Sequence, residues 1–168
     1  GNSFYYMFHN DRLVKHDLGT GKDKVLYKYS NFERGILRLS PDGQKLLFGL
    51  EYPGDKKSRL FTMPAEGGTE NEVCAVQEAR GFATAFWSWD GNYIYFVEIL
   101  ESLKTNLWRV ASVGGQPEKV WSSENRVEIF DIHPDGDQVA FSIRERKTVV
   151  RMIENLSSEI AKVFSENE

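Results

Sequence analysis

The chain of 168 residues is poor in the residues that build disulfides and metal sites. Cys74 is its only cysteine, so neither an internal disulfide nor a zinc site made of cysteines is possible. We expect Cys74 to be a small buried side chain. The three histidines, His9, His16 and His133, show no metal-binding spacing. We therefore expect no metal and no other cofactor, with His133 serving in a turn.

The sequence also lacks an excess of positive charge and any long apolar run. It has 21 Lys and Arg against 25 Asp and Glu, a net charge of −4. A nucleic acid held through its phosphates needs a basic surface, so we expect no nucleic-acid partner. No apolar run approaches the ~18 residues of a membrane helix, so we expect no membrane insertion. The first residues, GNSFYYMF, do not include the basic segment with which a secretory signal begins.

The motifs of several large enzyme classes are missing as well. The sequence has no Gly-x-Ser-x-Gly nucleophile elbow, no P-loop and no Gly-x-Gly-x-x-Gly. Glu98 and Glu101 together resemble a two-carboxylate hydrolase site, but Glu101 falls in a loop and is expected to face solvent. We therefore predict no catalytic residues and a protein that is not an enzyme.

Aromatic residues and glycine are abundant instead, with four Trp, seven Tyr, eleven Phe and 14 Gly. This composition favours β-structure with tight turns. Many of these residues lie in segments that recur along the chain. LSPDGQKLLFGL, WSWDGNYIYFVE and IHPDGDQVAFSI carry Asp-Gly pairs spaced 48 and 45 residues apart. Two further markers recur every 47 residues, namely a leucine at 13, 60 and 107 and a pair of glycines at 67–68 and 114–115.

Each Asp-Gly pair is predicted to be a tight turn, because proline presets φ and glycine tolerates positive φ. An apolar strand is predicted after each turn, at residues 45–50, 93–99 and 138–143, and further strands are predicted at 59–64, 149–154 and 160–164. Four short strands fit into each unit of 47 residues. The residues of the recurring turns are therefore assigned to turn geometry and not to a binding or catalytic site. They are Pro41, Asp42, Gly43, Gly67, Gly68, Asp90, Gly91, Gly114, Gly115, Pro134, Asp135 and Gly136.

Four antiparallel strands in 40–50 residues are typical of a β-propeller blade. We predict an all-β fold, a β-propeller segment of about four blades forming one domain, with a β-sandwich as the alternative. The predicted blades are residues 4–34, 35–80, 81–125 and 126–164, followed by a tail at 165–168. Blade 1 is expected to lack its inner strand. A fragment of a larger ring, or an arc that pairs with another copy, is favoured over a small closed ring.

The repeat resembles the TolB-type WD40-like propeller repeat of TolB, tricorn-like and prolyl-oligopeptidase-like proteins. The resemblance is carried by SPDG followed by KLLF, and by RLFTMPAEGG, WSWDGNYIYF and NLWRVASVGG. It is strong from Leu37 to Leu156 and weak from Phe4 to Tyr29. It implies a bacterial protein in the periplasm or elsewhere outside the cytoplasm. Proteins with this repeat include a partner of an envelope system, sensor segments and non-catalytic domains of serine peptidases.

The resemblance and the absence of catalytic motifs predict a non-enzymatic scaffold or sensor that binds a protein or peptide. The alternative is the non-catalytic propeller part of a serine peptidase. Self-association of two arcs is a further expectation, because it would bury exposed blade faces. Candidate binding residues are Trp87 and Trp89, of which one is expected to pack between blades and the other to be exposed, and Lys56 and Arg59 in a charged loop.

Overall fold

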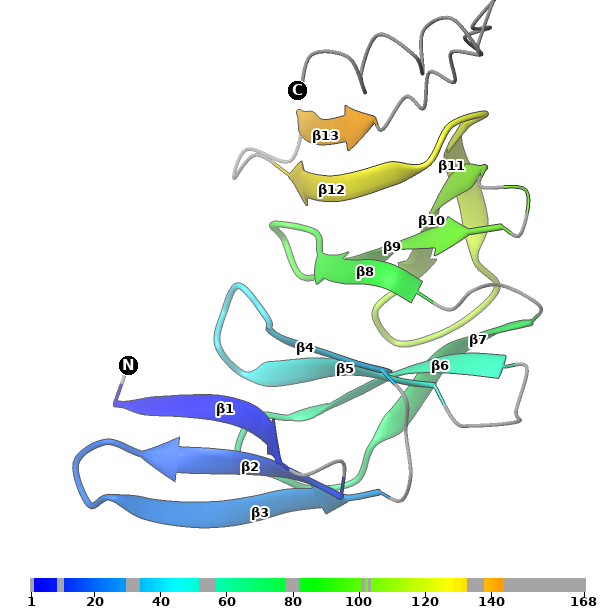
Figure 1. Ribbon diagram of the computed structural model, residues 1–168. Helices are drawn as coiled ribbons and strands as arrows, with labels where there is room; N and C mark the ends of the chain where they lie inside the picture. The colour runs from blue at the N-terminus through cyan, green and yellow to red at the C-terminus, as the bar shows by residue number, and fades with distance from the viewer. Residues whose placement is uncertain are drawn as a thin grey trace, which may run out of the picture.

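The computed structural model describes residues 2–8, 11–29, 34–51, 57–77, 82–100, 102, 104–132 and 138–143. Within these residues the chain forms thirteen β-strands and no helix, and the strands build antiparallel sheets (Figure 1). None of these residues belongs to a helix long and apolar enough to cross a membrane.

Each sheet contains strands that are consecutive in the sequence and pair in sequence order. Blade 1 consists of β1 (Ser3–Phe8), β2 (Arg12–Asp17) and β3 (Lys22–Lys28). Blade 2 consists of β4 (Arg34–Leu39), β5 (Lys45–Glu51), β6 (Lys57–Pro64) and β7 (Asn71–Gln77). Blade 3 consists of β8 (Phe82–Trp87), β9 (Tyr93–Ile99), β10 (Thr105–Ala111) and β11 (Glu118–Ser123). Blade 4 contributes β12 (Val127–Ile132) and β13 (Val139–Ile143).

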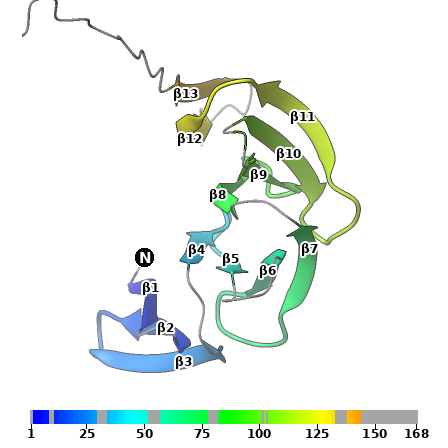
Figure 2. The same ribbon diagram turned by 45° about the vertical axis from the view of Figure 1, so that its right-hand side comes forward.

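The blades stack face to face along a curve (Figure 2). In this view β4 and β8 lie on the inner side of the curve, and β7 and β11 lie on its outer side. This stacking explains why the strands are apolar on both faces, because a blade between two others is covered on both sides. In β5, for example, Phe48 packs in the cluster shared with blade 1, whereas its neighbour Leu47 packs in the cluster shared with blade 3.

Two hydrophobic clusters join the first three blades. The cluster between blades 1 and 2 contains Leu13, Tyr29, Leu46, Phe48, Leu50, Met63 and Ala65. The cluster between blades 2 and 3 contains Leu47, Leu60, Val73, Cys74, Phe82, Ala85, Trp87, Ile94, Phe96 and Val110. Full burial of one large apolar side chain is worth about 1.5–3 kcal/mol, so these blade junctions hold the fold together.

The same pair of positions meets at successive junctions. Tyr27 on the last strand of blade 1 contacts Phe48 of blade 2, with ring centroids 5.2 Å apart. Trp121 on the last strand of blade 3 contacts Phe141 of blade 4 at 5.0 Å. Cys74 is the equivalent residue of blade 2, 47 positions from each aromatic, and packs in the cluster with Phe96.

The Asp-Gly turns are built from the same hydrogen bonds in blades 2 and 3. Ser40 donates its hydroxyl to Asp42 at 2.6 Å and accepts the backbone N–H of Lys45 at 2.8 Å, while Gly43 has a φ of 73°. Ser88 and Asp90 repeat this arrangement, and Gly91 has a φ of 70°. Pro134, Asp135 and Gly136 lie outside the described residues, as do the strands predicted at 149–154 and 160–164.

Candidate functional site

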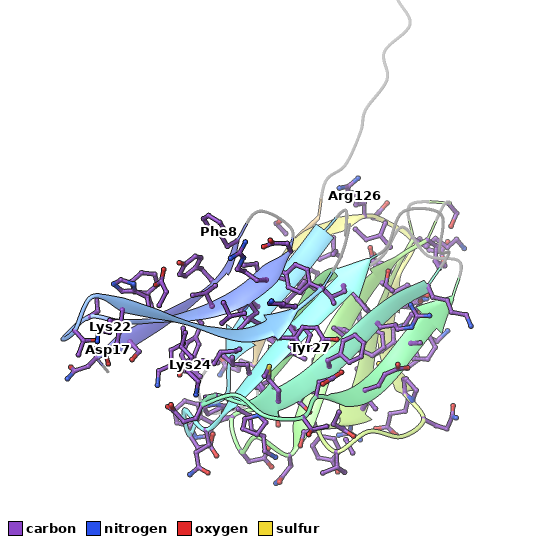
Figure 3. All side chains as sticks on the ribbon, turned by 90° about the horizontal axis from the view of Figure 1, so that it is seen from below. Phe8, Asp17, Lys22, Lys24, Tyr27 and Arg126 are labelled. Carbon is purple, nitrogen blue, oxygen red and sulfur yellow. The ribbon has the colours of Figure 1, made fainter. Side chains whose placement is uncertain are left out.

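One edge of the arc is made of turns, and we call it the turn edge. It comprises residues 18–21, 40–44, 65–70, 88–92 and 112–117. Backbone hydrogen bonds hold the turns of each blade together, because the N–H of Ala65 donates to Gln44 O and the N–H of Ser112 donates to Asn92 O, both at 2.8 Å. Figure 3 shows Asp17 and Lys22 at the turn-edge end of blade 1, with Phe8 further along the blade.

Trp87 and Trp89, at the first turn of blade 3, differ in their exposure to solvent. Trp87 ends β8, is 8% exposed and packs in the cluster between blades 2 and 3. Trp89 lies in the following turn and is 62% exposed. It stands at the turn position that Pro41 holds in blade 2. Of the two tryptophans, only Trp89 is therefore available to a partner.

Arg59 lies on a strand and not in a charged loop. Arg59 belongs to β6, which begins at Lys57, and its Nε lies 4.0 Å from a carboxylate oxygen of Glu72 on the adjacent strand. The side chain thus spans two strands of one sheet. Lys56 lies outside the described residues.

Where blade 2 meets blade 1, the turn edge is closed by charged contacts. Lys15 Nζ donates to Glu66 Oε1 at 2.5 Å, and Lys24 Nζ donates to the backbone oxygen of Glu66 at 2.7 Å. The hydrogen bond raises the pKa of Lys15 and lowers the pKa of Glu66. Gly67 has a φ of 93°, and a Cβ there would lie 3.3 Å from Leu26 Cδ2. Glycine thus allows the turn to approach blade 1 closely.

The next junction repeats the geometry with different chemistry. Residues 47 positions further on are Thr62, Asn71 and Val113, so the lysine–glutamate pair is absent. Asn71 Nδ2 donates to Val113 O at 3.3 Å, in the place of the Lys24 contact. A shallow cavity of about 280 Å³ opens here. We call it the junction pocket, and it is lined by Lys45, Thr62, Met63, Pro64, Thr69, Asn71, Ser112 and Val113.

Glu98 is buried away from the turn edge, at the opposite end of β9. Its Oε2 accepts hydrogen bonds from Asn106 Nδ2 at 2.9 Å and from Trp108 Nε1 at 2.8 Å. Glu101, its partner in a two-carboxylate site, lies outside the described residues. The sequence did not predict this cluster, although an acidic residue where blade 2 has Leu50 was a signal. Two donors on one carboxylate make it a packed polar network.

The remaining titratable candidates also have structural surroundings. Burial raises the pKa of the Cys74 thiol to about 12, with a smaller contribution from the Glu72 carboxylate, so the thiol is protonated at neutral pH. His16 Nδ1 lies 2.7 Å from Asp23 Oδ1 on the neighbouring strand. His9 and His133 lie outside the described residues, over which no group of three or more metal-binding side chains is found.

No protein-family model and no curated protein matches the sequence. Solved structures do match. The chain is similar to TolB from Acinetobacter baumannii at 16% identity and a TM-score of 0.64, over 83% of this chain and 34% of TolB. It is similar to a chain from a study of two prolyl endopeptidases at 15% identity and a TM-score of 0.62, over 84% of this chain and 24% of that one.

A third likeness is to hydrazine synthase of Kuenenia stuttgartiensis, at 15% identity and a TM-score of 0.65, over 86% of this chain and 47% of that one. The chain thus spans less than half the length of these proteins. Such low identities show the fold alone. Together with the stacked antiparallel sheets, they show that this chain has the blades of a β-propeller, as its repeat predicts.

Proposed function

We propose that this chain is a non-enzymatic β-propeller scaffold whose turn edge binds a protein or peptide, with Trp89 as the main anchor. The observation that carries the proposal is the exposure of Trp89 in a turn. The turn does not require an aromatic residue, since Pro41 serves in the equivalent place. Tryptophan is among the residues most enriched at the energetic centres of protein interfaces.

Other exposed apolar side chains share the turn edge of blade 3. Val113 is strongly exposed, and Tyr93 is partly exposed with the guanidinium of Arg109 lying 4.7 Å from its ring centroid. The arginine packs against the tyrosine ring. Aromatic side chains of this kind supply large contact areas at a small cost in conformational entropy.

The non-enzymatic part of the proposal is supported by where the reactive groups lie. Cys74 is buried and protonated, and Glu98 is enclosed by the donors of Asn106 and Trp108. Neither group reaches the turn edge. Turnover of a hydrolase or lyase substrate by the purified protein, abolished by one substitution in the described residues, would refute this part.

The binding role is tested by selecting ligands from a display library of short random peptides. The affinity of the selected peptides for the wild type and for Trp89→Pro is then measured by fluorescence anisotropy. We expect the variant to bind about thirtyfold more weakly, the effect of losing an anchor worth about 2 kcal/mol. Val25→Thr, an exposed position on β3, is the matched control. Equal binding by Trp89→Pro would contradict the proposal.

The serine-peptidase alternative is favoured by the likeness to the prolyl endopeptidase chain. It is tested on the product of the complete natural gene with a fluorophosphonate probe, which labels an activated serine. Under the alternative the product is labelled and cleaves peptides, and under our proposal neither occurs. The peptide-binding test does not depend on this result.

Self-association is the second part of the proposed function. Phe4 and Phe8 of β1 are exposed, although the residues that hold the same register in blade 2, Leu46 and Leu50, are buried against blade 1. Leu18 is exposed where blade 2 has the buried Ala65. The outer face of blade 1 therefore repeats a blade-docking face, and a blade of a second copy fits it.

Sedimentation velocity tests this association on the chain itself. We expect a concentration-dependent dimer, and we expect Phe8→Lys to shift the equilibrium to the monomer. Lys22→Glu, on an exposed end of β3, is the control and should leave the dimer intact. A wild-type protein that stays monomeric at high concentration would contradict the proposal.

A further inference from the structure

We infer that the junction pocket between blades 2 and 3 binds a carboxylate that carries hydroxyl or amide groups, either a small hydroxy acid or the acidic side chain of a peptide. The inference rests on the pocket itself and does not depend on Trp89.

Two residues with little exposed surface offer their hydroxyls to the pocket. Thr62 is 6% exposed and Ser112 is 7% exposed, and neither side chain forms a hydrogen bond within the described residues. Both line the pocket. Thr62 faces blade 3, because it follows Leu60 by two residues on β6 and Leu60 packs in the cluster between blades 2 and 3. Neither hydroxyl oxygen is among the buried side-chain atoms without a partner, so both are open to solvent in the pocket, and a ligand oxygen can bind them in place of water.

The repeat shows what normally occupies this place. Positions 15, 62 and 109 are equivalent and hold Lys15, Thr62 and Arg109. Lys15 bonds the Glu66 carboxylate from the next blade. Arg109 bonds Glu118 within its own blade, with Nε donating to Oε1 at 2.6 Å. Only the Thr62 position, among these three, lacks a charged pair formed by the chain itself.

The carboxylate of the first junction has no equivalent at the second. Glu66 supplies it at the first junction, and the equivalent residue at the second is Val113. A positive charge is still present, because Lys45 lines the pocket. Thr62, Thr69 and Ser112 offer hydroxyls and Asn71 offers an amide, while Pro64 and Val113 form apolar walls.

The pocket size limits the ligand. At about 280 Å³ it lies just below the ~300 Å³ at which pockets for drug-sized ligands begin. A sugar acid or one acidic side chain fits this volume. Because the pocket is shallow and its lysine is exposed, we expect affinities near 1 mM, a binding free energy of about −4.1 kcal/mol.

Amide NMR spectra of the whole chain test the inference directly. The probes are galacturonate, as a free hydroxy acid, and N-acetylglutamate α-amide, as the peptide form. Galactose and N-acetylglutamine amide are their uncharged controls. We expect at least one acid to shift the amides of Asn71, Ser112 and Val113, and whichever acid does so identifies the source. If neither acid shifts them, or if the uncharged control shifts them equally, the inference is wrong.

Variants that exchange the chemistry of the two junctions sharpen the test. Thr62→Lys with Val113→Glu recreates the first junction and should abolish binding. Lys45→Gln changes only an exposed side chain, so the fold is retained, and should weaken binding about fivefold. Lys15→Thr with Glu66→Val should open a hollow at the first junction and create a second set of shifts near Gly67. Unchanged binding by both Thr62→Lys/Val113→Glu and Lys45→Gln would overturn the inference.

Discussion

Trp87 and Trp89 are two residues apart, and they belong to two regions of the molecule that obey different constraints. Trp87 lies in the junction between blades 2 and 3, where it packs in a buried apolar cluster. Trp89 lies on the turn edge, where hydrogen bonds of Ser88 and Asp90 and the positive φ of Gly91 fix the backbone. A junction therefore specifies its side chains, whereas a turn specifies only its backbone and leaves the exposed side chain free for binding.

The junctions themselves differ at the turn edge. Between blades 1 and 2 the chain supplies its own lysine–glutamate pair, and between blades 2 and 3 it leaves hydroxyls around an open pocket. The apolar parts of both junctions are alike, since Phe48 and Phe96 are fully buried at equivalent positions. Binding is thus expected where a repeat retains the packing of its neighbours but lacks their internal partner.

The largest effect should follow from removing a junction residue. Phe96 is fully buried and its ring centroid lies 5.1 Å from that of Phe82. Phe96→Ala should lower the free energy of unfolding by about 3–5 kcal/mol through lost burial and the remaining cavity. Urea unfolding measures the loss. Tyr93→Ala on the same strand, partly exposed beside Arg109, should cost about 1 kcal/mol or less. Equal losses for the two variants would contradict the view that the junction residues stabilise the fold more than the exposed residues do.

A smaller loss is expected at the buried carboxylate of the same junction. Glu98→Leu places the blade 2 residue in blade 3 and leaves the donors of Asn106 and Trp108 without an acceptor. It should lower the free energy of unfolding by about 1–3 kcal/mol, whereas Glu98→Gln keeps an acceptor oxygen and should cost less. A Glu98→Leu variant as stable as the wild type would show that the carboxylate is dispensable.

On the turn edge, a pH-dependent effect is expected at Asp90. The hydrogen bond from Ser88, with those from Asn92, lowers the pKa of the Asp90 carboxyl in the folded protein. Its contribution to stability is therefore present above the unfolded pKa, about 3.9, and is lost as the pH falls through the folded pKa. Asp90→Asn should be less stable than the wild type at neutral pH and equal to it in acid.

Urea unfolding of Asp90→Asn and the wild type at several pH values measures this difference. Asp23→Asn, on a strand, should show a pH dependence of the same sign, because the hydrogen bond from His16 lowers the pKa of that carboxyl as well. A stability difference for Asp90→Asn that does not change with pH would contradict the assignment of Asp90 to the turn.

The smallest effect on stability should come from the most exposed tryptophan. Trp89→Pro gives the turn of blade 3 the residue found in blade 2, and it should change the free energy of unfolding by no more than about 0.5 kcal/mol. Thermal unfolding measures it. A loss comparable to that of Phe96→Ala would place Trp89 in the packing and remove its exposed surface from the binding proposal.

The sequence predicted the strands well where a repeat marked them. The strand predicted at 93–99 coincides with β9, and that predicted at 45–50 is one residue shorter than β5. A fixed period carries this information, because each marker recurs in the same place in a blade. The prediction did not extend β6 back to Lys57, because the polar residues before Arg59 carry no strand signal.

Contacts between blades could not be predicted in the same way. The hydrogen bond from Lys24 to Glu66 O joins residues 42 apart, and no local pattern encodes it. The burial of Glu98 depends on donors from the adjacent β10 and on the covering blade. The junction pocket lies where the second junction lacks the lysine–glutamate pair of the first, a difference that becomes visible only when the blades are compared as neighbours in space.

Fluorine NMR of the chain labelled with 5-fluorotryptophan tests the central claim most directly. The four resonances are assigned with single Trp→Phe variants, and their solvent isotope shifts are compared in H₂O and D₂O. The account predicts a large isotope shift for Trp89 and almost none for Trp87, and a selected peptide should move the Trp89 resonance alone. A shielded Trp89, or a peptide that moves Trp87 and leaves Trp89 unchanged, would contradict the account.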